Sequence, residues 1–147
     1  MEIQRLRGGD RDVARTLFST MASVFGEPTE ALSDGYLDTL LDRESFWAIA
    51  AHADGVLAGG LTAHTLPMTR GEQSEVFVYD IAVAPEHQRQ GVGRCLMEEL
   101  RRLAAADGIG EIFGPADNDD THALDFYRAL GGEPAPVTIF TFTSGQG

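Results

Sequence analysis

The sequence of 147 residues contains no lysine and a single cysteine, Cys95. One cysteine excludes an internal disulfide, and its place in an apolar helical stripe predicts a buried, inert thiol in a reducing compartment. No segment approaches the ~20 consecutive apolar residues of a membrane-spanning helix, and the N-terminus lacks a basic and then apolar signal pattern. We therefore expect a cytoplasmic protein that is neither exported nor inserted in a membrane.

Positive charge is also scarce. Eleven basic residues, all arginine, stand against 23 acidic residues, which gives a formal net charge of −12. Such a surface repels nucleic acid and anionic lipid and favours cationic partners, although solubility alone is an equally simple reason for it. We expect a small cationic substrate, and neither nucleic acid nor a membrane as partner.

The length and composition of the chain suit one domain over residues 1–147. Apolar residues make up 43% of it, and a chain of this length can bury a core. Side-chain periodicity predicts strands at 2–6, 46–53, 56–66, 75–83, 111–116 and 137–142, and helices at 10–24, after Ser33, at 91–106 and up to Leu130. A hairpin turn at Asp54-Gly55 and a bulge at Gly59-Gly60 are expected. The order predicts an α+β fold with a mixed, mostly antiparallel sheet flanked by helices.

The segment from Gln88 to Gly93 is the most informative, because it lies between an apolar strand and an amphipathic helix. The first N–H groups of a helix have no intrahelical partner, and the helix dipole adds partial positive charge, so this place binds anions. Glycines at 91 and 93 remove side chains that would hold a phosphate away, and Arg89 adds a cation. The segment predicts a pyrophosphate-binding turn, with an ordinary strand-to-helix turn as the alternative.

The better-known phosphate loops do not fit. A P-loop needs a lysine, and the dinucleotide fingerprint needs a third glycine where Leu96 stands. The remaining pattern, Q-x-x-G-x-G after a strand ending Ile-Ala-Val, resembles the acetyl-CoA-binding motif of the GNAT N-acetyltransferases. The resemblance implies the GNAT fold and acetyl-CoA as co-substrate. It implies coenzyme contacts at Ile81, Ala82, Val83, Gln88, Arg89, Gln90, Gly91, Val92, Gly93 and Arg94.

Asp80 is the only charged residue in the apolar run from Val76 to Val83. A lone carboxylate in a buried strand must face a solvent-filled cleft, pair with another group or be protonated, because burying an unpaired charge costs much free energy. It lies about 10 Å along the strand from the coenzyme motif. We expect Asp80 to be the base that deprotonates an ammonium acceptor and, with Tyr79, to bind it. A strand-end acid that only meets water is the structural alternative.

The segment from Ala123 to Gly131 resembles the A-x-x-F-Y-x-x-L-G helix of GNAT proteins, whose tyrosine lies near the thioester sulfur. The resemblance implies that Tyr127 protonates the departing thiolate. A tyrosine at helical spacing that only packs in the core is the alternative.

An acidic turn with Asp117, Asp119 and Asp120 precedes this helix. A helix N-cap explains one of these carboxylates but not three, so we expect them to bind a polycationic acceptor. A metal site is the competing interpretation. The spacing matches no EF-hand loop, and the four histidines are scattered, so we expect no metal.

Within the GNAT group, the segments Phe46–Ala51, Ser74–Val83 and Glu86–Gly91 resemble aminoglycoside 3-N-acetyltransferases of the gentamicin-resistance type. This resemblance implies an antibiotic-resistance enzyme that acetylates the 3-amino group of the deoxystreptamine ring, with Asp80 as base. Related domains often pair, which suggests a homodimer. Two alternatives stay open: a GNAT enzyme for another amine, such as a polyamine or a protein N-terminus, and a non-catalytic acyl-CoA-binding domain.

Overall fold

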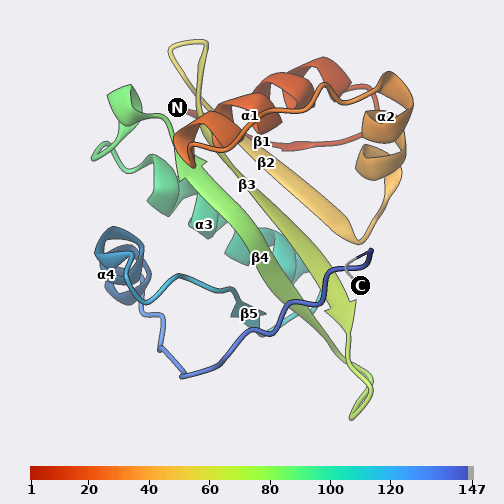
Figure 1. Cartoon of the computed structure of the whole chain (residues 1–147), viewed down its shortest axis with the longest axis vertical. Coiled ribbons are helices and arrows are strands. Elements are labelled where there is room, and N and C mark those ends of the chain that lie inside the picture. The colour runs from red at the N-terminus through yellow and green to blue at the C-terminus, as the bar shows by residue number, and fades with distance from the viewer. Residues whose placement is uncertain (146–147) are drawn as a thin grey trace. The chain divides into compact units, whose positions relative to one another are not determined.

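The structure, a computed structural model, describes residues 1–145 (Figure 1). Its contacts divide the chain into two compact units, Met1–Pro115 and the residues from Ala116 onward. The first unit contains β1 (Glu2–Leu6), α1 (Arg11–Val24), α2 (Asp34–Asp42), β2 (Phe46–Ala53), β3 (Val56–Pro67), β4 (Ser74–Val83), the 3-10 turn η1 (Pro85–His87), α3 (Val92–Ala106) and β5 (Ile112–Phe113), and the second unit contains α4 (Thr121–Ala129).

The five strands form one sheet in the order β1-β2-β3-β4-β5. Every neighbouring pair is antiparallel except β4 and β5, which run parallel. The α+β class and the mixed, mostly antiparallel sheet are therefore confirmed. The hairpin between β2 and β3 turns at Asp54 and Gly55, whose φ angles are 52° and 77°. Positive φ at both central residues is the backbone of a type I′ turn, as the Asp-Gly pair predicts.

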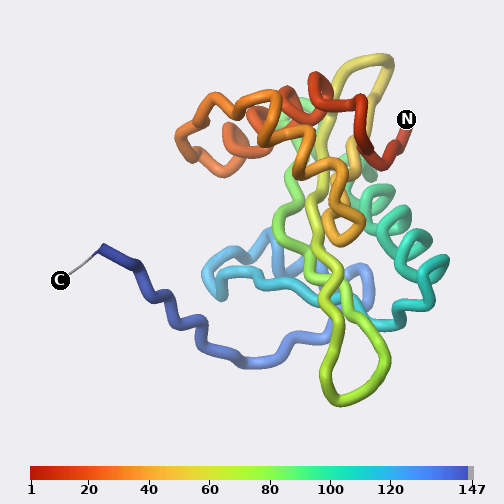
Figure 2. Tube along the Cα trace, turned by 90° about the vertical axis from the view of Figure 1, so that its right-hand side faces the viewer, coloured from red at the N-terminus to blue at the C-terminus, as the bar shows by residue number. Residues whose placement is uncertain are grey.

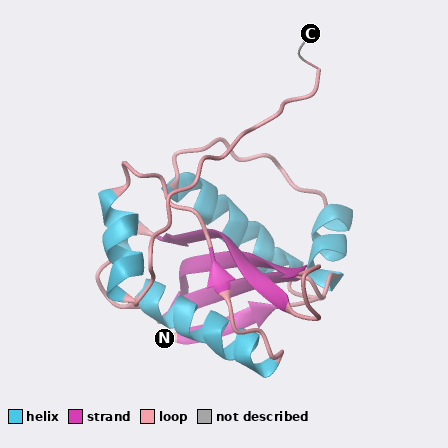
Figure 3. Ribbon diagram, turned by 90° about the horizontal axis from the view of Figure 1, so that it is seen from below, coloured by secondary structure: helices cyan, strands magenta, loops and turns pink. Residues whose placement is uncertain are grey.

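Helices cover both faces of the sheet: α1 and α2 lie on one face and α3 on the other (Figures 2 and 3). On the α1 face, Leu17, Met21, Leu37 and Leu41 pack against the strands around Phe46. Each such leucine stabilises the fold by about 1.5–3 kcal/mol on burial. The apolar stripe of α3 covers the other face, and its buried residues are Val92, Leu96, Met97, Leu100 and Ala104. Cys95 lies beside this stripe, half-buried and free.

The helix starts follow the sequence closely. The Ser33 hydroxyl accepts a hydrogen bond from the Tyr36 N–H at 3.1 Å, which confirms it as the N-cap of α2. Asp10 precedes α1 as expected, but its carboxylate accepts from the Arg7 N–H at 2.9 Å and makes no bond to the helix. Among the described residues, no helix is long and apolar enough to cross a bilayer.

Three strand predictions need correction. The expected bulge in β3 occurs, but it leaves Ala58 without a partner on β2, one residue before the expected Gly59-Gly60 pair. The strand expected at 111–116 is reduced to Ile112–Phe113. The strand expected at 137–142 is absent from the described residues, and its apolar side chains are 71–93% exposed. A strand needs an edge to pair with, and the two residues of β5 offer no length on which a further strand could extend.

Candidate active site

A bulge in β4 determines where Asp80 points. Thr62 pairs with Asp80 and the next residue, Ala63, pairs with Val78, so Tyr79 is an extra residue without a partner on β3. Side chains alternate along a strand and paired residues share a face, so Asp80 faces the side of Thr62, and Val78 the opposite side. Without the bulge, Asp80 would share the buried face of Val78.

The face that Asp80 shares with Thr62 is the one covered by α1. Ala82, two residues after Asp80, pairs with Gly60. A Cβ at Gly60 would lie 2.2 Å from Cδ1 of Leu17 on α1, so this backbone and this helix touch. Phe77 shares the face as well, because it pairs with His64, which in turn pairs with the buried Phe46. The bulge therefore brings Phe77, Tyr79 and Asp80 to a single face of the sheet.

The Asp80 carboxylate is half-buried and, among the described residues, has no hydrogen-bond or ion-pair partner. Burial raises the pKa of Asp80 above its ordinary value, and the negative charge of Glu27 raises it further. Both causes disfavour the ionised form, because a poorly solvated anion beside another anion is costly. A carboxyl group held in this way takes up a proton more readily than an exposed one, as a general base requires.

Aromatic rings form a row beside Asp80. The Tyr79 ring is 61% exposed. Its centroid lies 5.8 Å from His64 and 6.2 Å from Phe77. Phe77 in turn lies 5.1 Å from Phe113 on β5. Burial and the charge of Arg43 lower the pKa of His64, so its imidazole is mostly neutral at pH 7. The row offers an apolar surface next to a single carboxylate.

The turn between β4 and α3 leaves backbone N–H groups available. Gly91 is the N-cap of α3 with φ 82° and ψ 11°, and no side chain caps the helix. The first bond into the helix runs from the Cys95 N–H to the Gly91 carbonyl at 3.0 Å. The amides of Val92, Gly93 and Arg94 therefore have no carbonyl partner within the helix, and they can hold an anion.

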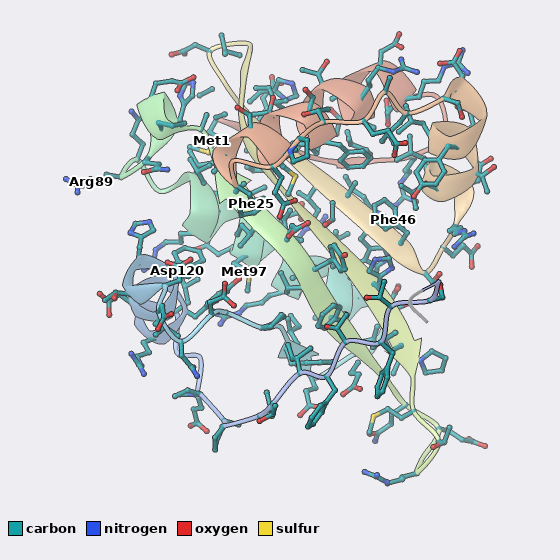
Figure 4. All side chains as sticks on the ribbon, viewed as in Figure 1. Met1, Phe25, Phe46, Arg89, Met97 and Asp120 are labelled. Atoms are coloured by element: carbon teal, nitrogen blue, oxygen red, sulfur yellow. The ribbon has the colours of Figure 1, made fainter. Side chains whose placement is uncertain are left out.

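Two glutamines hold this turn in shape. The Gln88 Nε2 donates to the Val83 carbonyl at 3.1 Å, and the Gln90 Nε2 donates to the Glu86 carbonyl at 3.4 Å. Arg89 also has a positive φ, 62°, which is uncommon for a residue with a side chain. Its side chain points away from the protein at the tip of the turn (Figure 4). The glutamine side chains fix the loop, whereas the exposed Arg89 can reach a bound anion.

The edge of β4 next to this turn offers further donors. Strand β5 pairs with β4 only at Val76 and Phe77. The Ala84 N–H donates to the Ala58 carbonyl on β3 at 2.8 Å. Because backbone groups alternate along a strand, Ala82 also faces β3, while Ile81 and Val83 face the edge that β5 does not reach. Of the three expected coenzyme contacts on β4, Ile81 offers its N–H and carbonyl to a ligand, and Val83 offers its N–H, because the Val83 carbonyl already accepts from Gln88.

The second unit holds the other expected site residues. Asp120 is the N-cap of α4, and its carboxylate accepts from the Ala123 N–H at 3.0 Å. Asp117 and Asp119 are exposed in the turn before it. Tyr127 is half-buried with its ring 5.3 Å from the Phe126 ring. Among residues 1–145, no group of three or more His, Cys, Asp or Glu side chains is arranged to hold a metal ion.

The structure thus brings Asp80 and the turn from Gln88 to Arg94 together on β4 and its continuation, whereas Tyr127 and the acidic turn belong to the other unit. Sequence reasoning missed Glu27, which lies in a segment without regular structure. It also missed His64, because one histidine in a strand carries no spacing signal. Only the register of the sheet places His64 on the face of Asp80.

Known proteins share this fold. The chain matches the acetyltransferase (GNAT) family over residues 12–131. It superimposes on the crystal structure of an aminoglycoside acetyltransferase, meta-AAC0020 from an uncultured soil metagenomic sample, in complex with trehalose. The TM-score is 0.92 at 30% sequence identity, over 97% of this chain and 95% of that one. The same enzyme in complex with sisomicin gives a TM-score of 0.91.

Curated relatives match over shorter stretches. The GCN5-related N-acetyltransferase 2 of Arabidopsis thaliana is 38% identical over 75 residues, which are 49% of this chain and 28% of that protein. The streptothricin acetyltransferase of Streptomyces lavendulae is 31% identical over 90 residues, which are 61% of this chain and 46% of that protein. The chain thus spans less than half the length of these two relatives. With the family match covering most of its residues and the fold shared with a solved member, the chain belongs to the GNAT acetyltransferase family.

Proposed function

We propose that this protein transfers the acetyl group of acetyl-CoA to an amine of an aminoglycoside. One observation carries the proposal: a half-buried carboxylate, Asp80, has no partner among residues 1–145 and lies on the strand whose continuation through η1 leads to the uncapped start of α3. Three residues separate Asp80 from the end of β4, about 10 Å of extended chain. A base and an anion site at this spacing suit a nucleophile on one side and a coenzyme diphosphate on the other.

The residues present fit the donor. The free amides of Val92, Gly93 and Arg94 at the start of α3 suit a diphosphate, and the exposed Arg89 adds positive charge. The N–H and carbonyl of Ile81 and the N–H of Val83 suit the amides of the pantetheine arm, which can extend the sheet by pairing with β4. A backbone N–H on this edge, that of Val83, is our candidate for stabilising the developing oxyanion.

The chemistry needs a neutral amine, whereas alkyl ammonium groups are mostly protonated at neutral pH. Asp80 accepts one proton from the acceptor's ammonium group, directly or through water. The amine nitrogen then attacks the thioester carbonyl, a C–N bond forms and the C–S bond breaks. In our proposal Tyr127 donates the proton that the thiolate takes up. The second proton lost by the nitrogen, after attack, restores the Tyr127 phenol through water, and Asp80 passes its own proton to solvent.

The acceptor class follows from charge and from the comparison. The net charge of −12 and the exposed carboxylates of Asp117 and Asp119 suit a polycation. A structural neighbour that shares 30% of its sequence is an aminoglycoside acetyltransferase solved with sisomicin, which supports an aminoglycoside for this chain. The resemblance of this chain's own sequence to 3-N-acetyltransferases supports the 3-amino group of the deoxystreptamine ring as the acetylated position.

The test is a thiol-release assay with acetyl-CoA across gentamicin, sisomicin, spermidine and a peptide with a free N-terminus, with the acetylated position assigned by NMR. We expect kcat/KM to be highest for the two aminoglycosides. Asp80→Asn should lower kcat by about 100-fold or more, in the range of general-base catalysis. Asp42→Asn, an exposed acid at the end of α2, serves as the matched control. Faster turnover of spermidine or the peptide would reject the acceptor class, and a fully active Asp80→Asn would reject the base.

A further inference from the structure

A second carboxylate lies beyond the end of the helix that covers the Asp80 face. Glu27 lies two residues after Phe25, the C-cap of α1. Gly26 has a φ of 70°, and the Glu27 N–H donates to the Ala22 carbonyl at 2.9 Å, which holds the start of this segment against the helix. From there the chain runs back to α2 (Figure 1). Glu27 thus follows the end of α1, the helix that covers the face to which the β4 bulge turns Asp80, and its charge acts on Asp80.

The two carboxylates have no positive partner. Among the described residues, neither Glu27 nor Asp80 forms an ion pair. The arginines of α1 have acidic partners of their own: Arg11 pairs with Asp38 at 2.8 Å, and Arg15 pairs with Asp34. The arginines of α1 thus pair with acids of α2 and not with Glu27 or Asp80. A local excess of negative charge therefore remains on this face.

The neighbouring groups do not relieve this excess. On β3, His64 has a lowered pKa and is mostly neutral at pH 7. The charge of Glu27 reaches Asp80 and raises its pKa. Beside them, the exposed Tyr79 ring and Phe77 offer an apolar wall. Two anions next to aromatic rings suit a cyclic acceptor that carries two ammonium groups. Its apolar C–H face would pack on the aromatic wall, and its ammonium groups would bind the two carboxylates.

We propose that Glu27 is a specificity-determining residue for the acceptor, which binds a second ammonium group while Asp80 takes the ammonium group to be acetylated. The inference rests on the proposed function and deepens it. Glu27 binds and Asp80 reacts, so the pair selects acceptors that carry two neighbouring ammonium groups over those with one. Removing the Glu27 charge therefore affects acceptor binding far more than the acetyl-transfer step.

The test compares Glu27→Gln with Glu30→Gln, a control in the same exposed segment. For sisomicin we expect Glu27→Gln to raise KM about tenfold, which corresponds to about 1.4 kcal/mol of binding, with kcat within twofold. For glucosamine, which has one amine, KM should not change. The acid limb of kcat/KM should move to lower pH, because a lost negative neighbour lowers the pKa of Asp80. Glu30→Gln should behave as the wild type in all these measurements.

Equal KM changes for both acceptors, or an acid limb that stays in place, would overturn the role of Glu27. Calorimetric titration of sisomicin into each folded variant measures the same loss of binding without turnover, and an unchanged Kd in Glu27→Gln would also overturn it. The two proposals fail separately. If the wild type acetylates neither acceptor, the proposed function is wrong; if it acetylates sisomicin, loses activity in Asp80→Asn and is unaffected by Glu27→Gln, only this inference is wrong.

Discussion

Asp80 shows at the scale of one residue how a reactive group costs stability. Its carboxylate is half-buried without a partner, and burial, followed by the charge of Glu27, raises its pKa. A carboxyl whose pKa is higher in the folded than in the unfolded protein destabilises the fold where it is ionised. Below the ordinary carboxyl pKa of about 4, both states are protonated and the penalty disappears. Stability contributed by this group is therefore lost as pH rises.

We accordingly predict that Asp80→Asn raises the Tm at pH 7–8, although it lowers activity. The gain should shrink as the pH falls toward about 4, because the wild-type carboxyl then takes up its proton. Thermal unfolding followed by circular dichroism at several pH values measures it. The matched control is Asp119→Asn in an exposed turn, for which we expect no change in Tm. A lower Tm for Asp80→Asn at neutral pH would mean that the carboxylate makes a stabilising contact.

The sequence could identify Asp80 because one charge among apolar strand residues is visible in the pattern. It could not show which way the side chain points, since that depends on a bulge at Tyr79 whose position is set by pairing with β3. Glu27 was beyond sequence reasoning for a similar reason: a lone acid in an irregular segment has no period or spacing, and only its place at the end of α1 gives it a neighbour.

At the scale of an element, the two glycines of the turn before α3 have different roles. Gly91 is the N-cap with φ 82°, and a Cβ there would meet nothing of the protein within 4 Å. Gly93 is the second residue of the helix and is not among the residues with positive φ. The expectation that glycine permits an unusual φ therefore holds at position 91. At position 93, we propose that glycine lets the ligand approach the backbone closely.

We predict that Gly91→Val raises the KM for acetyl-CoA by at least tenfold, because a branched side chain would stand over the amides that hold the diphosphate. Gly55→Val is the matched control: its φ is 77° and it too has no atom within 4 Å, but it lies in the β2–β3 hairpin. Both variants should lose about 1–2 kcal/mol of stability from backbone strain in urea unfolding. Equal acetyl-CoA KM values for the two variants would reject the diphosphate site.

Elements with a strong internal pattern were predictable, and those that depend on a partner were not. The periodic helices α1 and α3 and the strands β1, β2 and β4 lie within a residue or so of their expected bounds. The segment 137–142 consists of β-branched and aromatic residues, as many strands do, yet the structure leaves it unpaired and exposed. Such a composition expresses a preference for extended chain, whereas a strand exists only where another edge supplies hydrogen bonds.

At the scale of the whole molecule, the charge of −12 acts oppositely on the two substrates that we propose. A polycationic aminoglycoside is attracted from a distance, which raises its association rate. The anionic coenzyme is repelled by the molecule as a whole but attracted near the turn, where Arg89 and Arg94 are exposed. Because these two contributions have opposite signs for the coenzyme, its salt dependence should be the weaker one.

We therefore predict that raising the ionic strength from about 0.01 M to about 0.1 M lowers kcat/KM for sisomicin several-fold, since the Debye length falls from about 30 Å to about 10 Å. The value for acetyl-CoA should change less than twofold. Initial rates with one substrate saturating measure each value, and glucosamine, with a single charge, controls for effects of salt on the enzyme itself. A fall for glucosamine as large as that for sisomicin would assign the effect to the enzyme, because attraction by the whole molecule must grow with the number of charges on the acceptor.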